Sequence, residues 1–380
     1  MTNSIQDVFQ RGYAEYCRKY KVSSVQRKAA TDIMKCKTGE LGYFVYTCSD
    51  CGYTDERACS CRNRHCPSCQ SIPRERWIDE RKSEVFDESQ YFHIIMTIPQ
   101  ELNQLFYLNQ DKLYPLLHLC SSQCTIELSR SSRGMGGTPC VTQVLHTWGR
   151  KLNYHPHIHS IVSGIGLSKT NQLVRCKEDY LFPLSMLMEM FRGKLLYHIN
   201  DLYLSDSLLI PQNLRKDFAW SNLMSKLHYI DWAPYIKETF NGNGNAIDYL
   251  GRYTYHVAIS NSRIKEVSDT HVTFKFFDFK TQSYQDATIT LVEFIYRYLR
   301  HVLPKGMQKI RYSGLLNNRF KNRNLQLLSI LLHQKRRKAI LKDLNMAEIL
   351  KQLWSTDITI CPQCHGPNLR LASRPFHLKL

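Results

Sequence analysis

The amino-acid sequence predicts an α+β protein with a zinc ribbon near its N-terminus and a basic helical region toward its C-terminus. Short β-branched segments alternate with longer amphipathic ones, a pattern typical of mixed strands and helices. Two Cys-x2-Cys pairs lie close together between Cys48 and Cys69, which indicates a small metal-stabilised module. Thirteen Lys and Arg and no acidic residue lie between Phe294 and Lys342.

The overall composition favours a nucleic-acid partner. The chain has 380 residues, and its 51 Lys and Arg outnumber its 33 Asp and Glu to give a formal net charge of +18. Fourteen cysteines without a secretion signal argue against a disulfide framework, and their clustering favours metal. No apolar run approaches the roughly 20 residues that a membrane span needs. We therefore expect a soluble, intracellular protein with a nucleic-acid partner.

The first half of the chain begins with helices and the cysteine module. We expect helical structure over residues 5–36, the module over 43–70 and a charged amphipathic helix over 74–86. A β-branched strand follows at 92–98, and a helical stretch at 102–130.

Two further strands are predicted at 141–148 and 156–164. The short connection between them favours antiparallel pairing, which places His146 beside His157 and His159. The remaining elements are expected in this order: helices at 181–204, 219–231 and 247–257, a β-hairpin at 272–279 and 287–291, and a helix at 293–302. The rest of the chain reads as mostly helical and very basic.

Three histidines recur at every second residue at the start of the third predicted strand: His155, His157 and His159. Because side chains alternate along a strand, all three point to the same face. Two imidazoles separated by an apolar residue can hold one divalent ion. The alternative is a surface strand that carries histidines by chance, and the apolar residues that continue the strand disfavour it.

Four cysteines in the two N-terminal knuckles can bind a tetrahedral structural Zn²⁺ through their thiolates. They are Cys48, Cys51, Cys66 and Cys69. Cys61 and His65 lie between the knuckles and allow a different ligand choice or a second metal. Arg64 belongs to the arginine-rich rim of this module, which suggests phosphate contact, with a purely structural role as the alternative.

A lone Cys-x2-Cys knuckle, Cys361 to Cys364, lies near the C-terminus, with His365 and His377 as nearby extra donors. It supplies only two thiolates. It is either half of a metal site completed elsewhere in the fold or by another subunit, or a degenerate remnant. The sequence leaves these alternatives open.

Tyr249 and Tyr253 are four residues apart and therefore share one face of the predicted helix at 247–257. The alternative is aromatic packing in a core. Gly251 and Arg252 between the two tyrosines argue against a fully buried helix.

With these motifs in this order, the chain resembles transposases of the insertion sequence 91 family, within the HUH (His-hydrophobic-His) single-strand endonucleases. The resemblance runs nearly end to end. It rests on SCRNRHCPSCQ (60–70), RERW (74–77), residues 93–99, HTWG (146–149), YHPHIH (154–159), YLGRY (249–253), VAISN (257–261) and HVLPKG (301–306).

The resemblance implies a role for each matching residue. His157 and His159 match the metal-binding HUH motif, and Tyr249 and Tyr253 match the paired nucleophiles. The implied HUH domain has a central antiparallel sheet with flanking helices, and its tyrosine helix is held against the metal. The implied reaction is single-strand DNA cleavage and rejoining through a 5′-phosphotyrosine, which serves rolling-circle-like transposition.

The catalytic cation implied by the resemblance is Mg²⁺ or Mn²⁺. It would polarise the scissile phosphate and neutralise charge on its oxygens. Imidazoles alone favour softer metals, so a third protein ligand is expected. His146 is the first choice, followed by His155, Asp248 and His93.

The expected partners are single-stranded or hairpin DNA at the element ends and target DNA, in a bacterial cytoplasm, with self-association as a further expectation. Basic side chains would contact the DNA backbone and make binding dependent on salt. The candidates are Arg64, Arg252, Arg263, Lys305 and Arg311.

The resemblance divides the chain into four predicted units. These are an N-terminal helical segment (1–42), a zinc-ribbon domain with its linker helix (43–86), an HUH nuclease domain (87–265), and a C-terminal DNA-binding region with a β-hairpin, basic helices and the cysteine knuckle (266–380).

Three rival functions stay open on the sequence. A replication-initiation nuclease of a plasmid or phage would share the chemistry. A non-catalytic zinc-ribbon nucleic-acid-binding protein would explain the charge and cysteines but would leave the histidines and tyrosines without a role. A metal hydrolase would use the histidines to activate water.

Overall fold

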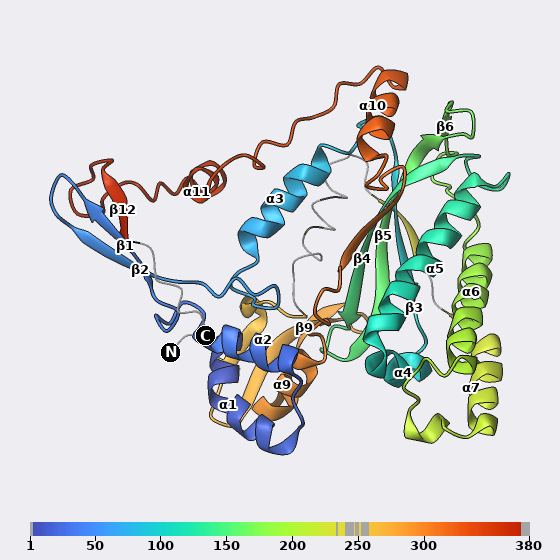
Figure 1. Ribbon diagram of the computed structural model, residues 1–380, viewed down its shortest axis with the longest axis horizontal. Coiled ribbons are helices and arrows are strands. Elements are labelled where there is room, and N and C mark those ends of the chain that lie inside the picture. The colour runs from blue at the N-terminus through green and yellow to red at the C-terminus, as the bar shows by residue number, and fades with distance from the viewer. Residues whose placement is uncertain (1–2, 233–234, 240–246, 248–250, 252–257, 374–380) are drawn as a thin grey trace.

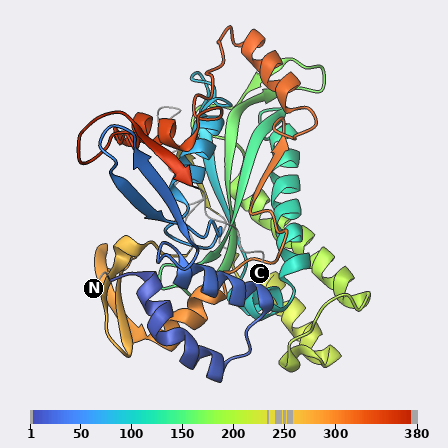
Figure 2. The same ribbon diagram turned by 60° about the vertical axis from the view of Figure 1, so that its left-hand side comes forward.

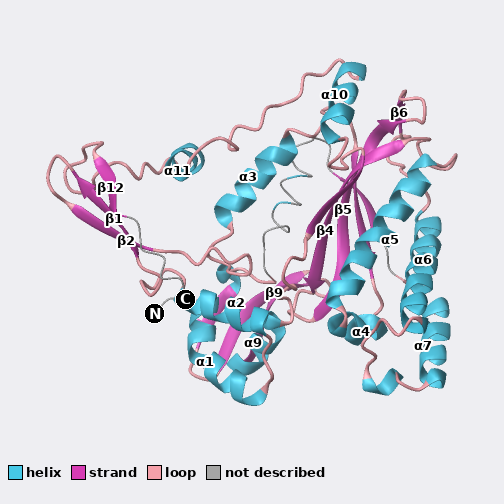
Figure 3. Cartoon of the chain, in the orientation of Figure 1, coloured by secondary structure: helices cyan, strands magenta, loops and turns pink. Residues whose placement is uncertain are grey.

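The computed structural model describes residues 3–232, 235–239, 247, 251 and 258–373. Its helices and antiparallel strands confirm the α+β class (Figure 3). The helices are α1 (Ile5–Lys19), α2 (Ser24–Lys35), α3 (Ser71–Lys82), α4 (Asn103–Leu108), α5 (Gln110–Arg130), α6 (Leu184–Leu204), α7 (Asp217–Tyr229), α9 (Leu291–Leu299), α10 (Lys321–Leu331) and α11 (Met346–Trp354). The strands are β1 (Tyr43–Cys48), β2 (Thr54–Ala58), β3 (Tyr91–Thr97), β4 (Thr138–Trp148), β5 (Tyr154–Leu167), β6 (Leu173–Arg175), β7 (Tyr235–Thr239), β8 (Ile264–Val267), β9 (His271–Asp278), β10 (Ser283–Thr290), β11 (Ile310–Gly314) and β12 (Leu369–Ser373).

The largest sheet has the strand order β11-β4-β5-β3-β7, and β6 pairs with the end of β5. The predicted antiparallel pairing of the second and third strands is confirmed, because β4 and β5 pair with His146 opposite His157. Strands β7 and β11, which the sequence pattern did not reveal, extend the sheet at its two edges.

The two faces of this sheet have different covers. Helices α5 and α6 pack on one face, where Leu145, Ile158 and Val162 enter the main hydrophobic core (Figure 1). On the opposite face, Val144 and Ile161 pack in one cluster with α3, and α10 packs farther along β5. Since side chains alternate along β5, the residues next to Ile158 point to the α3 face.

A second core joins the N-terminal helices to a later part of the chain. Helices α1, α2 and α9 pack with the three-stranded sheet β10-β9-β8 around buried residues that include Phe9, Phe274 and Phe294. The prediction that residues 5–36 are helical is confirmed for two helices, with a break at residues 20–23 between α1 and α2. Ser23 begins α2 with a capping box to Gln26, and this cap replaces the helical bonds that a continuous helix would make there.

The third sheet, β12-β1-β2, pairs the last strand of the described chain with the hairpin at residues 43–58. Figures 1 and 2 both show β12 beside the β1–β2 hairpin, at a distance from the large sheet. The packing of α1 on α9 and of β12 on β1 crosses the sequence-based domain boundaries. Those boundaries stay predictions.

The expectation that the basic C-terminal region is mostly helical is wrong. Residues 332–345, which we call the strap, form neither helix nor strand and run from α10 toward α11 (Figure 1). The strap lies along α3, since the Leu341 amide donates to Asp79 Oδ2 at 2.7 Å and Arg76 donates to the Leu344 carbonyl at 2.6 Å. Four consecutive cations at 335–338 also disfavour a helix there through mutual repulsion.

Among the residues that the structure describes, no helix is both long enough and apolar enough to cross a membrane.

Candidate metal centres and nucleic-acid site

Three histidines converge on the α3 face of the large sheet. His157 and His159 lie two residues apart on β5, and His146 lies opposite His157 on β4. All three are at least nine-tenths buried, and one ring nitrogen from each lies within 4.8 Å of the others. The structure therefore brings together the two histidines of the predicted motif and the first-choice third ligand.

Hydrogen bonds aim the ring nitrogens of this cluster. His157 Nδ1 lies 2.7 Å from the His155 carbonyl, so that nitrogen carries the proton and leaves the Nε2 lone pair available. His157 Nε2 lies 3.0 Å from His159 Nε2. Two imidazole nitrogens bound to one cation can lie this far apart, so the donor set fits a divalent metal.

Burial keeps the cluster in its metal-binding form. Burial is the main reason why the pKa of His157 falls to about 3; the hydrogen bond to the His155 carbonyl opposes this shift, and the charges of His155 and His93 add to it. Burial likewise holds the pKa of His159 well below its usual range, with help from His157, His93 and Lys309. Both rings are therefore neutral near pH 7, the state in which an imidazole donates its lone pair to a metal.

His93 has a different place from the one expected. The sequence suggested His93 as one of the lower-ranked candidates for the third metal ligand. In the structure its Nε2 lies 2.7 Å from His159 Nδ1, on the side of that ring away from His157. The two rings stack at 5.0 Å between centroids. His93 therefore orients the His159 ring from behind, as outer partners of metal-bound histidines commonly do. His155, the other described reserve ligand, is half-buried and lies outside the three-histidine group.

Two other side chains shape the centre. The indole of Trp148 stacks on His146 at 4.6 Å between centroids, which fixes the plane of that ring. Lys309 Nζ lies 4.7 Å from the Trp148 ring centre, and burial lowers the pKa of this lysine to about 7. Neither residue was predicted from the sequence, and Lys309 looked like one cation among many in a basic run.

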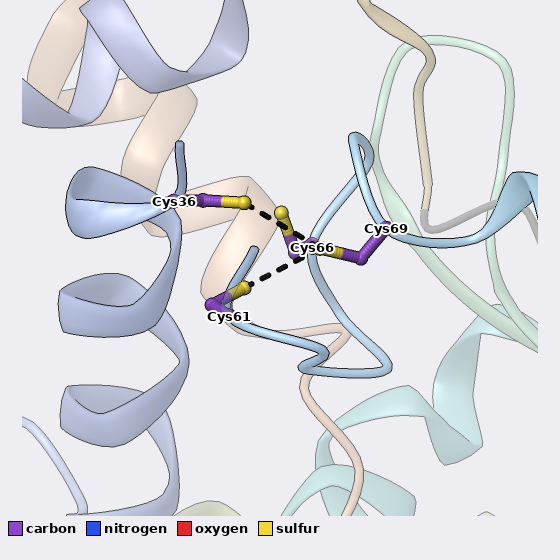
Figure 4. A group of neighbouring side chains, drawn as sticks. All are labelled: Cys36, Cys61, Cys66 and Cys69. Atoms are coloured by element: carbon purple, nitrogen blue, oxygen red, sulfur yellow. Dashed lines mark hydrogen bonds between the residues drawn. The ribbon is translucent and has the colours of Figure 1, made fainter. Parts of the chain in front are cut away.

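Four cysteine thiols form a second centre at the end of α2 and in the loop before α3. They belong to Cys36, Cys61, Cys66 and Cys69 (Figure 4). The sulfur of Cys69 lies 3.4 Å from that of Cys36 and 3.7 Å from that of Cys61. Sulfurs around a tetrahedral zinc with Zn–S bonds of about 2.3 Å lie about 3.8 Å apart, so the set matches a closed zinc site.

The predicted ligand set was wrong in its grouping. Cys66 and Cys69 pair with Cys36 and Cys61, whereas Cys48 and Cys51 lie with Cys361 and Cys364. Cys36 ends α2, and folding of α2 against α1 carries its thiol to the loop that holds Cys66. His65, the other alternative ligand, lies outside both groups, and its ring accepts a hydrogen bond from Arg64 at 3.3 Å.

The segment that carries the two tyrosines touches the histidine face through its described residues. Ile247 packs in one cluster with Trp77 and Ile78 of α3 and with Ile161 of β5. At Gly251, an added Cβ would lie 2.3 Å from Ile78 Cγ1, so only glycine allows this close approach. Tyr249, Arg252 and Tyr253, together with the reserve ligand Asp248, lie outside the described residues.

Comparisons with known proteins identify the family. A family model described as "Transposase zinc-binding domain" matches residues 8–98, and one described as "Putative transposase" matches residues 140–324. The chain is 35% identical to "Putative transposase y4qJ" of Sinorhizobium fredii over 327 residues, which cover 84% of this chain and 82% of that protein. The chain belongs to the insertion sequence 91 family of transposases.

A second relative has the same kind of name. The transposase is 28% identical to "Transposase for insertion sequence element IS801" of Pseudomonas savastanoi pv. phaseolicola over 305 residues, which cover 78% of this chain and 71% of that protein. No solved structure matches the chain. The group of Cys36, Cys61, Cys66 and Cys69 lies wholly within the matched zinc-binding domain, which supports structural zinc in the transposase.

The predicted DNA-contacting cations differ in whether their side chains are already bonded to backbone carbonyls. Arg64 donates to the carbonyls of Met307 and Pro304 at 2.6 and 2.9 Å, and Arg263 donates to those of Lys275 and Arg150 at 2.7 and 2.8 Å. These two guanidinium groups therefore link segments of the transposase that are far apart in the sequence. The predicted DNA contacts stay predictions for the whole set.

Lys305 and Arg311 have no such carbonyl partner among the described residues. Lys305 is exposed in the turn before Gly306, and Arg311 is half-buried on β11 opposite Gln143.

Proposed function

We propose that the transposase cleaves and rejoins single-stranded DNA by the HUH mechanism, with Tyr249 and Tyr253 as nucleophiles beside a metal held by His157, His159 and His146. The observation that carries the proposal is the convergence of three buried histidines on the sheet face where Ile247 also packs, with Gly251 against Ile78 of the covering helix α3. The two tyrosines belong to the same short segment as these two residues.

The donor set favours one of the two expected cations. Three imidazoles are softer ligands than the oxygens that Mg²⁺ prefers, and no carboxylate joins the group among the described residues. Mn²⁺ is therefore the better fit. When bound, such an ion polarises the scissile phosphate and neutralises charge on its oxygens.

The chain's own residues carry the covalent step. The hydroxyl oxygen of one tyrosine bonds to phosphorus, the bond from phosphorus to the 3′ oxygen breaks, and a proton passes from the phenol to solvent while the departing 3′ oxygen gains one. The product is a 5′-phosphotyrosine and a free 3′-OH. One phosphoester replaces another, so rejoining needs no nucleotide cofactor. A second tyrosine allows two DNA ends to be handled in turn.

A groove next to the histidine strand has side chains that suit unpaired DNA. It is lined by Tyr107, Tyr154, Tyr296 and Arg300, together with Lys151. The Arg300 guanidinium lies 4.6 Å from the Tyr107 ring centre and 4.9 Å from that of Tyr154. Because Tyr154 is buried, the surfaces available to stack bases are those of Tyr107, Tyr296 and Arg300, and such stacking does not depend on base sequence. The groove supports single-stranded DNA as the substrate.

The proposal is tested by incubating end-labelled single-stranded DNA that carries the element's own end with the transposase and Mn²⁺ or Mg²⁺. We expect a cleaved strand and a protein–DNA adduct on a denaturing gel. A non-catalytic DNA-binding protein gives no cleavage, and a hydrolase gives cleavage without an adduct. A replication initiator instead prefers a plasmid or phage origin. Either of the first two outcomes contradicts the proposal, whereas the third would leave its chemistry intact and change the DNA that it serves.

Gly251 offers a test of how the tyrosine segment is positioned. Gly251→Ala places a methyl group against the buried Ile78 side chain and displaces the segment. A displacement of about 1 Å can lower a rate by roughly 100-fold, so we expect a loss of adduct formation of that order with DNA binding kept. Adduct yield per minute and DNA binding by fluorescence anisotropy measure the two effects.

Two further variants control this prediction. Gly193→Ala adds the same methyl group to an exposed position of α6 with open space around it, and we expect unchanged activity. Adding Ile78→Ala to Gly251→Ala removes the atoms that clash and should restore part of the rate. Equal activity of Gly251→Ala and the native transposase would show that this contact does not position the nucleophiles.

A further inference from the structure

The sulfur atoms of Cys48, Cys51, Cys361 and Cys364 meet at one end of the β12-β1-β2 sheet. One Sγ from each lies within 4.8 Å of the others, with 3.7 Å between Cys48 and Cys364 and 3.7 Å between Cys51 and Cys361. We propose that these four thiolates bind a second structural Zn²⁺, which fastens the C-terminal end of the chain to its N-terminal hairpin. We call this site the clasp.

The sulfur spacing fits zinc and does not fit two disulfides. The cross-knuckle separations of 3.7 Å match the roughly 3.8 Å expected between sulfurs of a tetrahedral zinc site. A disulfide needs its sulfurs about 2.05 Å apart. All four positions of the tetrahedron are taken by sulfur, so no position is open to water or substrate. The clasp is therefore a structural site.

The backbone around the clasp has the turns of two zinc knuckles. After the first knuckle, the Gly52 amide donates to the Cys48 carbonyl at 3.0 Å, and Gly52 has φ of +73°. After the second, the His365 amide donates to the Cys361 carbonyl at 2.9 Å, and His365 has φ of +58°. The two halves thus repeat the same local geometry, although 310 residues separate Cys51 from Cys361.

Contacts beyond the thiols join the two halves. Cys48 lies opposite Leu369 in the pairing of β1 with β12. The side-chain amide of Asn368 donates to both carboxylate oxygens of Asp50 at 2.9 and 3.0 Å. These contacts hold the knuckles face to face before any metal is considered.

The sheet that carries the clasp is too small to be stable through apolar burial alone. The apolar cluster of this sheet contains three buried residues, Cys48, Cys361 and Leu369, and two of them are ligands. Units with so little core depend on metal or disulfides for their folding energy. Bound zinc would supply that energy, because the ligands are brought together only in the folded state.

The clasp also anchors the strap. At its other end the strap continues from α10, which packs on the large sheet through Leu325 and Leu328. Between the two ends, the strap bonds to Asp79 and Arg76 of α3, the helix that covers the histidine face. Loss of the second zinc should therefore release residues 346–373 and loosen the strap, while α10 stays packed.

Counting zinc tests the proposal. We expect two zinc ions per native chain, released by a mercurial reagent and measured with a chromogenic chelator. The Cys361→Ser/Cys364→Ser variant should keep one zinc, and so should Cys61→Ser/Cys66→Ser. Cys17→Ser/Cys176→Ser removes two thiols that lie outside both groups and should keep two. One zinc in the native chain, or two in Cys361→Ser/Cys364→Ser, overturns the clasp.

Two measurements guard against a variant that fails to fold. Cys364→His keeps a zinc ligand at an exposed position and should retain two zinc ions. Limited proteolysis followed by mass spectrometry should show new cuts within 346–373 in Cys361→Ser/Cys364→Ser and none in the large sheet. Unchanged proteolysis of 346–373 would contradict the anchoring role. Neither result depends on DNA cleavage, so failure of the clasp is distinguishable from failure of the proposed function.

Discussion

His157→Ala and His159→Ala are each expected to lower DNA cleavage by about 1,000-fold or more while DNA binding is largely kept. Each change removes one of three nitrogen donors from a buried centre, and the loss of one electrostatic stabiliser of a transition state typically costs about 100- to 1,000-fold. Loss of a metal ligand should exceed that. Strand cleavage on a denaturing gel, over a range of Mn²⁺ concentrations, measures the effect.

Neighbouring histidines provide matched controls for this prediction. His155→Ala changes the half-buried histidine on the same strand that lies outside the group, and a small effect is expected. His93→Ala removes the partner of His159 Nδ1, and the loss of such an outer partner typically lowers metal affinity or activity by about 10- to 100-fold. DNA binding by anisotropy and thermal unfolding should be measured for each variant. If DNA binding fell as far as cleavage in His157→Ala and His159→Ala, the two histidines would have a structural role instead.

The Tyr249→Phe/Tyr253→Phe double variant is expected to form no covalent adduct at any metal concentration. Phenylalanine keeps the aromatic ring but lacks the oxygen that bonds to phosphorus. Each single variant should retain part of the adduct, because the other tyrosine can attack. A denaturing gel of labelled DNA, with protease digestion to prove the protein link, measures both results.

A third tyrosine serves as the control for this pair. Tyr229→Phe changes a residue that is 88% exposed at the end of α7 and should leave the adduct unchanged. An adduct in the double variant would exclude these two residues as the nucleophiles. Cleavage that persists without an adduct would point to attack by water.

Local patterns were enough to predict the three central strands of the large sheet and the proximity of His146 to His157 and His159. The three strands predicted for the large sheet all form, because the β-branched and aromatic residues of these segments suit a pleated sheet, which here is buried on both faces. The connection between β4 and β5 is short, which fixed their antiparallel register and placed His146 beside the histidine pair. The role of His93 was harder to predict from the sequence, because it depends on which nitrogen of the His159 ring faces the His93 side chain of β3.

The grouping of the cysteines and the strap could not be predicted from the sequence, because both depend on tertiary packing. Spacing along the chain favours the two N-terminal knuckles as partners in one site. In the folded chain each knuckle has a different partner: α2 brings Cys36 to Cys66, and the pairing of β12 with β1 brings Cys361 to Cys51. One indication was present in the sequence. The cysteines between Cys48 and Cys69, together with the knuckle Cys361–Cys364, provide enough thiols for two sites of four ligands each, which is more than one zinc ion can bind. The strap was missed because its bonds go to side chains of α3, which no periodicity reveals.

The long separation within the clasp has a consequence for synthesis of the protein. Cys51 leaves the ribosome 310 residues before Cys361, which at about 5 to 20 residues per second is roughly 15 to 60 s. The thiols of Cys36, Cys61, Cys66 and Cys69 can be complete early in translation, whereas Cys48 and Cys51 must wait for the last part of the chain. A product cut short before Cys361 would carry one zinc, so its metal content would distinguish it from a chain translated to its end.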